Sequence, residues 1–168
     1  MAVVNRNSTA IANLVASPRV INNPAHAAAD LQEIVGLITS AADDTNASIG
    51  RFFRIPSNAR VSNMLYSGAD ATTAGNIDLG LYDTADNGGA VVDADFFASA
   101  FALTNGPDSN TELAYESGVY TLTLSGLMLW QALGLSADPV KEYDVAYTIT
   151  TTFNGGPTLM KLTGRFVQ

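Results

Sequence analysis

The sequence predicts a mainly β fold, an antiparallel β-sandwich of jelly-roll type with two short helical insertions and an extended N-terminal arm. Short apolar segments recur at the spacing of a sandwich or barrel, and turn-forming residues separate them. The 168-residue chain is 47% apolar and contains no cysteine. Its stability must therefore come from packing or from assembly, because disulfides and thiolate metal sites are excluded.

The arm is expected over residues 1–29 and the sandwich body over residues 30–168. The arm mixes Asn, Ala, Ser and Pro and has only a short helical pattern before Pro18. Because this segment has no pattern that buries a face by itself, we expect it to be ordered only against a neighbouring chain. Its two cations, Arg6 and Arg19, are therefore the candidate partner-binding residues.

Eight segments of the body are expected to be strands, because they are apolar or alternate with a period of two and are bounded by turn residues. In one of them, Ile77, Leu79 and Leu81 alternate with other residues, and a hairpin-type turn at Asn87-Gly88-Gly89 follows. The alternation is clearest in the last two segments. The eight segments are 31–40, 49–55, 61–66, 77–82, 90–92, 119–124, 143–149 and 160–166.

Two helical insertions are expected between these strands. In the first, Asp93 can cap a helical turn that carries Phe96, Phe97 and Phe101. The second covers residues 126–135, where apolar side chains at spacings of three share one face. The residues of that face are Leu127, Trp130 and Leu133.

Charge is divided unevenly along the chain. Residues 61–140 contain ten acids and no lysine or arginine, whereas five arginines lie within the first sixty residues. So acidic a body favours docking against a patterned protein surface and disfavours nucleic acid and anionic membranes. The longest uncharged stretch, residues 117–137, is interrupted by polar residues and glycines, and we interpret it as core and not as a membrane span.

No motif indicates catalysis, and we expect no enzyme and no cofactor. The one histidine, His26, lies in the predicted arm, with only Asp30 as an acid nearby. A catalytic base belongs on a rigid scaffold, and no nucleophile elbow, phosphate loop or metal-binding spacing is present. An acid-pair glycoside hydrolase remains a remote alternative, because sixteen acids supply many carboxylate pairs although no motif selects one.

The acids between Asp83 and Asp95, around Gly88 and Gly89, raise the alternative of a calcium loop. The EF-hand pattern fails, because the twelfth position counted from Asp83 is Ala94 and not a glutamate. We therefore interpret these acids as solvated turn and cap residues.

Several segments of the body resemble a family of small proteins encoded in the head-gene region of tailed bacteriophages and prophages. These are RFFRIPSNARVSNMLYS (51–67), IDLGLYDT (77–84), GGAVVDADFFASAFAL (88–103), LWQALGLSADPVKEYDVAYTITT (129–151) and the final GRFVQ. The resemblance implies a capsid decoration, or cement, protein on the outer surface of the virion. It assigns no role to single residues.

That family implies two partners, the major capsid protein and the protein itself as a dimer or trimer. An alternative from another class is a receptor- or glycan-binding module of a phage head or tail fibre, which can use the same sandwich.

Overall fold

The structure is a computed structural model, and it describes residues 12–13, 16–18, 20–21, 30–41, 44–69, 74–104, 107–153 and 158–168. The chain divides into two units, residues 1–30 and residues 31–168, and the sandwich lies in the second. The candidate residues Arg6 and Arg19, like His26, lie outside the described residues.

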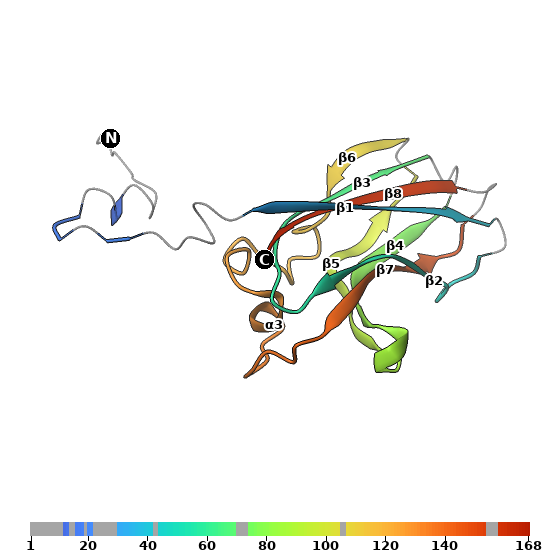
Figure 1. The fold of residues 1–168 in the computed structure, drawn as a ribbon. Helices are drawn as coiled ribbons and strands as arrows, with labels where there is room; N and C mark the ends of the chain where they lie inside the picture. The colour runs from blue at the N-terminus through green and yellow to red at the C-terminus, as the bar shows by residue number, and fades with distance from the viewer. Residues whose placement is uncertain are drawn as a thin grey trace, which may run out of the picture. The chain divides into compact units, whose positions relative to one another are not determined.

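The described residues contain eight strands in two four-stranded antiparallel sheets, which lie as two layers (Figure 1). The first sheet has the order β1-β8-β3-β6 and the second has the order β2-β7-β4-β5. The strands are β1 (Leu31–Ser40), β2 (Ile49–Pro56), β3 (Arg60–Gly68), β4 (Asn76–Asp83), β5 (Val91–Ala102), β6 (Asp108–Glu112), β7 (Glu142–Thr151) and β8 (Thr158–Val167).

The pairing of the strands is nested. β1 pairs with β8, β2 with β7, β3 with β6 and β4 with β5, each time antiparallel. Such an order arises when one long hairpin is folded over on itself, and it is the order of a jelly roll. The two sheets confirm the predicted antiparallel β-sandwich.

The core lies between the sheets and is built by alternate residues of each strand. The alternation predicted over residues 143–149 is present in β7, where the apolar residues at every second position are at most 3% exposed. In β4, Ile77, Leu79 and Leu81 are at most 1% exposed. Burial of each such side chain contributes about 1.5–3 kcal/mol. The β7 residues are Tyr143, Val145, Tyr147 and Ile149.

The first predicted helical insertion is wrong, because the segment from Asp93 to Phe101 belongs to strand β5 and Asp93 caps no helix. Opposite β4, Leu81 pairs with Asp93 but Leu79 pairs with Ala98, so β5 contains extra residues that form a bulge. A bulge interrupts the alternation of a strand. The consecutive phenylalanines, which suggested a helix in the sequence, lie in this bulge.

The predicted strand over residues 119–124 is also wrong, because these residues form turns. Tyr120 is nevertheless buried, and its hydroxyl donates to the carbonyl of Val61 at 3.0 Å. The strand that was not predicted is β6, which has the polar sequence DSNTE. This strand lies at the sheet edge beside β3, where a strand needs few apolar residues.

The second helical insertion is present but shorter than predicted. Helix α3 (Leu129–Ala132) lies within the expected range 126–135, and Leu129 is its buried residue. The predicted face is partly wrong, because Leu127 is 37% exposed. The helix begins where the amides of Leu129 and Trp130 donate to carbonyls of the loop between β2 and β3. No helix in the described part of the chain is long and apolar enough to span a membrane.

A single turn of 3-10 helix, η1 (Ala85–Asn87), connects β4 to β5, where the hairpin-type turn was predicted. Gly88 follows it with a φ of 95°, a left-handed conformation that favours glycine. The amides of Gly88 and Gly89 donate to the carbonyls of Ala85 and Thr84, which closes the turn.

Candidate functional site

The outer face of the first sheet exposes large apolar side chains. Residues 34, 36, 38 and 40 of β1 point towards the core, so the odd-numbered residues point outward. The exposed fraction of these side chains is between about a half and two thirds. They are Leu31 at 58%, Val35 at 49% and Leu37 at 65%, and Leu159 of β8 at 54%. We call these four residues the apolar face.

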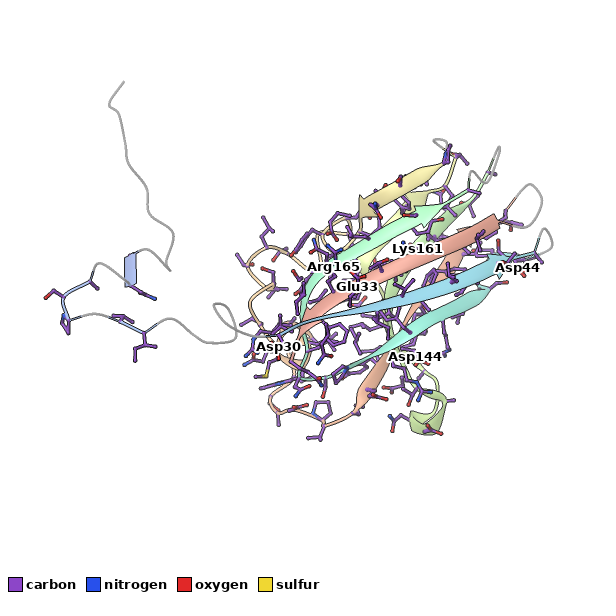
Figure 2. The ribbon with its side chains drawn as sticks, turned by 45° about the horizontal axis from the view of Figure 1, so that its top comes forward. Asp30, Glu33, Asp44, Asp144, Lys161 and Arg165 are labelled. Atoms are coloured by element: carbon purple, nitrogen blue, oxygen red, sulfur yellow. The ribbon has the colours of Figure 1, made fainter. Side chains whose placement is uncertain are left out.

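Charged residues lie on the same outer face of the first sheet. The Nε of Arg165 donates to a carboxylate oxygen of Glu33 at 2.7 Å, between paired positions of β8 and β1. Figure 2 labels this pair together with Lys161 of the same strand. A shallow cavity of about 310 Å³ lies beside Leu37, Leu159 and Lys161. An apolar surface with scattered charges suits a protein partner better than a small molecule.

The outer face of the second sheet is covered by the chain itself. Tyr82 and Ala146 are 0% exposed and Asp144 is 5% exposed, although Asp144 and Ala146 lie on the opposite side of β7 from its core residues. A Cβ added to Gly80 would lie 2.1 Å from the carbonyl oxygen of Asp93, so the bulge of β5 rests directly on that glycine. A side chain at position 80 would push the bulge away.

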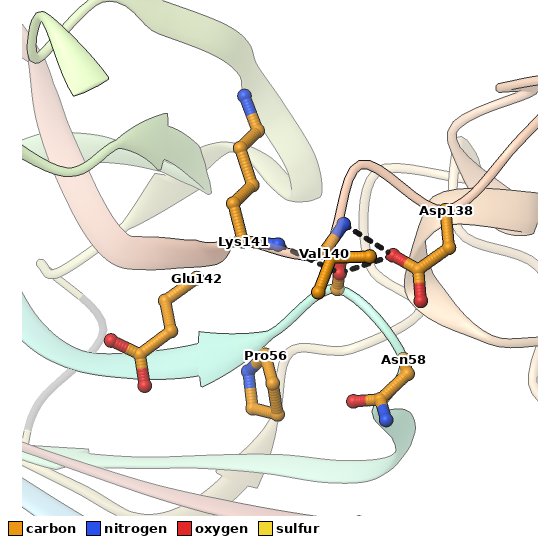
Figure 3. A pocket seen from close by; sticks show the side chains of 7 residues that line it. Pro56, Asn58, Asp138, Val140, Lys141 and Glu142 are labelled. Carbon is orange, nitrogen blue, oxygen red and sulfur yellow. Dashed lines mark hydrogen bonds between the residues drawn. The ribbon is translucent and has the colours of Figure 1, made fainter.

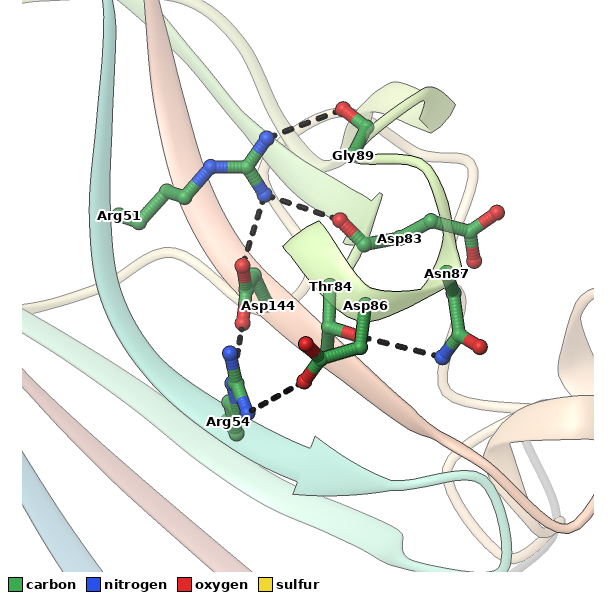
Figure 4. Close-up of polar contacts among 8 residues, drawn as sticks. All are labelled: Arg51, Arg54, Asp83, Thr84, Asp86, Asn87, Gly89 and Asp144. Carbon is green, nitrogen blue, oxygen red and sulfur yellow. Dashed lines mark hydrogen bonds and ion pairs between the residues drawn. The ribbon is translucent and has the colours of Figure 1, made fainter.

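A network of polar contacts fastens the β4–β5 turn to this face (Figure 4). Arg51 donates to the carbonyls of Asp83 and Gly89, each at 3.0 Å, and to the carboxylate of Asp144 at 2.8 Å. The second carboxylate oxygen of Asp144 accepts from the Nε of Arg54 at 2.9 Å. The buried carboxylate is thus shared by two arginines, and the turn is held by one of them.

The acids of the suggested calcium loop have other contacts. Asp83 lies 2.5 Å from the Nζ of Lys141, and Asp86 is 87% exposed at 4.0 Å from Arg54. Within the described ranges, no three histidine, cysteine or acidic residues gather in a way that could hold a metal ion. Asp83 and Asp86 therefore contact cations of this chain.

A rigid corner joins the end of β2 to the start of β7 (Figure 3). One oxygen of Asp138 accepts from the Ser57 hydroxyl at 2.5 Å and from the Val140 amide at 2.9 Å. Val140 has a φ of 50° and is 85% exposed. Because a β-branched residue avoids the left-handed region, these hydrogen bonds hold a strained backbone with its apolar side chain in solvent. A pocket of about 200 Å³ lies beside this corner.

The apolar face is not among the sites predicted from the sequence. The sequence nevertheless contained a signal for it. Strand β1 has apolar residues on both of its sides, with Val35 and Leu37 on one side and Ile34 and Ile38 on the other. A strand with two apolar faces is typical of a sheet covered on both sides. No other layer of the described body covers this one.

Comparison with known proteins finds a similar fold in solved structures but no similar sequence. No protein-family model and no curated protein sequence matches the chain. A chain in a structure of the cyanophage Pam1 capsid asymmetric unit is similar over 90% of this chain and 95% of that one, at 13% identity and a TM-score of 0.51. A chain of the Ralstonia phage GP4 capsid is similar over 84% and 87%, at 14% identity and a TM-score of 0.42. The likeness to the Pam1 chain shows a shared fold.

Proposed function

We propose that this protein is a structural protein of a phage head that binds the outer surface of the capsid shell and stabilises it. The observation that carries the proposal is the apolar face, which no other layer of the described residues covers, on a fold that this chain shares with a chain of a phage capsid. The major capsid protein is the proposed partner of that face. This role needs binding and no reaction.

The face and the charge distribution both suit such a role. Apolar side chains of β1 and β8 supply area to bury against a shell, and the ion pair of Glu33 with Arg165 supplies polar contacts that fix an orientation. The net charge of −8 keeps a densely arrayed protein soluble and discourages binding of nucleic acid.

Cosedimentation with expanded capsids that lack the protein tests the proposal. We expect saturable binding of the intact protein and a loss of binding of about tenfold or more when Val35→Asp and Leu37→Asp place charges on the apolar face. Leu122→Asp is the matched control, because Leu122 is 75% exposed and lies in the turns before α3. Intact protein that stays in the supernatant, or equal binding by both variants, would contradict the proposal.

The arm is proposed to add affinity, since residues 1–29 have no pattern that buries a face alone. Deletion of this segment should leave the thermal transition of the sandwich nearly unchanged and weaken binding to capsids. Added salt should weaken the binding of the intact protein only modestly, because Arg6 and Arg19 are the only cations of the arm. Truncated protein that binds with unchanged affinity would exclude the arm from this role.

A further inference from the structure

A groove lies between the start of β5, the segment that follows α3, and the start of β7. Its volume is about 440 Å³. Two apolar side chains of its wall are partly open to solvent, Val92 at 37% and Leu135 at 42%. The lining residues are Val92, Asp93, Leu133, Leu135, Pro139, Lys141 and Tyr143.

One acidic residue, Asp93, lines this apolar groove, and Asp95 is its neighbour. Burial and the nearby carboxyl of Asp95 raise the pKa of Asp93, which lines the groove. Burial also raises the pKa of Asp78, and the charges of Asp95 and Glu116 raise it further. The carboxyls of Asp93 and Asp95 are thus neighbours, and Asp95 and Glu116 both act on Asp78. The cation of the groove, Lys141, is already paired with Asp83.

In the part of the chain that the structure describes, no lysine or arginine forms an ion pair with Asp78, Asp93, Asp95 or Glu116. An occupant of matching chemistry has apolar side chains for the groove wall and a cation beside them for the carboxylates.

The arm of this chain contains such a segment. In Pro18-Arg19-Val20-Ile21 a cation directly precedes two β-branched apolar residues. Val20 is 48% exposed and Ile21 is 89% exposed. The chain therefore has a segment in which two exposed apolar side chains follow a cation, and a groove lined by apolar residues and Asp93.

We propose that the groove of one copy binds residues 18–21 of a second copy, with Val20 and Ile21 against the apolar wall and Arg19 beside Asp93 and Asp95. The inference deepens the proposed function and rests on it, because a capsid shell sets many copies side by side. The nine residues between Ile21 and Leu31 can span at most about 35 Å, so the exchange joins adjacent copies.

Engineered cysteines test the contact in the full chain, which has no native cysteine. A chain with Ile21→Cys is mixed at micromolar concentration with a chain that carries Val92→Cys, and oxidised glutathione is added as the oxidant. We expect a disulfide-linked dimer that forms about 100-fold faster than with Leu37→Cys, because docking raises the effective concentration of the two thiols to the millimolar range. Leu37 is the matched control, since it is more exposed than Val92 and lies on the apolar face.

Equal rates for the two pairs would overturn the proposal. So would a disulfide that closes within single chains carrying both Ile21→Cys and Val92→Cys at high dilution, because the arm would then occupy its own groove.

Charge reversal tests the polar half of the contact. Arg19→Glu in one chain, or Asp93→Lys with Asp95→Lys in the other, should slow the cross-link to the rate of the control pair, and combining the two changes should restore it. Asp86→Lys, at a residue that does not line the groove, should leave the rate unchanged. The amide variants Asp93→Asn and Asp95→Asn replace the lysines if those chains unfold. A cross-linking rate that is the same in all of these variants would overturn the proposal.

These experiments need no capsid, so their outcome is separate from that of the shell-binding test. Capsid binding without the cross-link would reject the groove contact alone. A cross-link without capsid binding would reject the proposed function alone.

Discussion

The two sheets of the sandwich differ in what covers their outer faces. In the second sheet, the face is covered by the β4–β5 turn, Arg51 and the bulge of β5. As a result, even the charged residue Asp144 is only 5% exposed. In the first sheet, Leu37 and Leu159 are more than half exposed. The comparison teaches that the chain covers one face with its own residues, whereas no described residue covers the apolar side chains of the other.

The largest expected effect concerns the ring that anchors the bulge of β5. Phe96 is 1% exposed, and its ring centroid lies 5.0 Å from that of Phe97 and 5.4 Å from that of Tyr120. Phe96→Ala should lower the free energy of unfolding by about 3–5 kcal/mol, because it removes a buried ring and leaves a cavity. Chemical denaturation measures this change. A variant that unfolds like the parent but binds capsids poorly would place the ring on an interface.

The next prediction compares the arginines on the two outer faces. Arg51→Ala should cost about 2–3 kcal/mol, because it removes hydrogen bonds to the turn and leaves the buried carboxylate of Asp144 with one partner. Arg165→Ala is the matched control and should cost about 1 kcal/mol or less, because its ion pair with Glu33 is exposed. Equal losses in chemical denaturation would mean that the two faces are not held differently.

Substitution on the apolar face should leave stability almost unchanged. Leu37→Gln is expected to alter the free energy of unfolding by less than about 0.5 kcal/mol, because the side chain is exposed in the folded chain. The same change should reduce binding of the dye ANS, which reports exposed apolar surface. A large loss of stability would show that the face is already covered in the free protein.

The smallest effect concerns Asp93 and depends on pH. Its pKa is raised above the ordinary value of 3.8 by burial and by the carboxyl of Asp95, so the folded chain binds the proton more tightly than the unfolded chain. The contribution of this group to stability therefore rises as the pH falls through the raised pKa towards 3.8.

Asp93→Asn should accordingly raise the melting temperature slightly at pH 7, and the gain should disappear in acid, where the carboxyl is protonated in both states. Calorimetry across this pH range measures the difference. Asp86→Asn is the control for the loss of one negative charge from a residue that is 87% exposed. A gain that persists in acid would mean that the charge of the Asp93 carboxylate is not its cause.

Local pattern in the sequence determined the class of fold and most of its strands. Alternation of apolar residues identified β4, β7 and β8, and Gly88 marked the turn between β4 and β5, because these signals depend on neighbours within a few residues. The charge division of the sequence also indicated a binding protein, and the uncovered apolar face supports that interpretation without testing it. The role of Arg6 and Arg19 stays a prediction.

Contacts between residues far apart in the chain decided the rest. Phe96 and Phe97 follow each other in a bulge that forms only because β5 folds over Gly80, and β6 is a strand because β3 offers it an edge. The alternation of β7 places Asp144 on the outward side of the strand, where an exposed acid is expected. It is buried because Arg51 and Arg54, about ninety positions away in the chain, both bind its carboxylate. Local propensity is weak beside such tertiary contacts, so only the folded structure shows which outer face remains open.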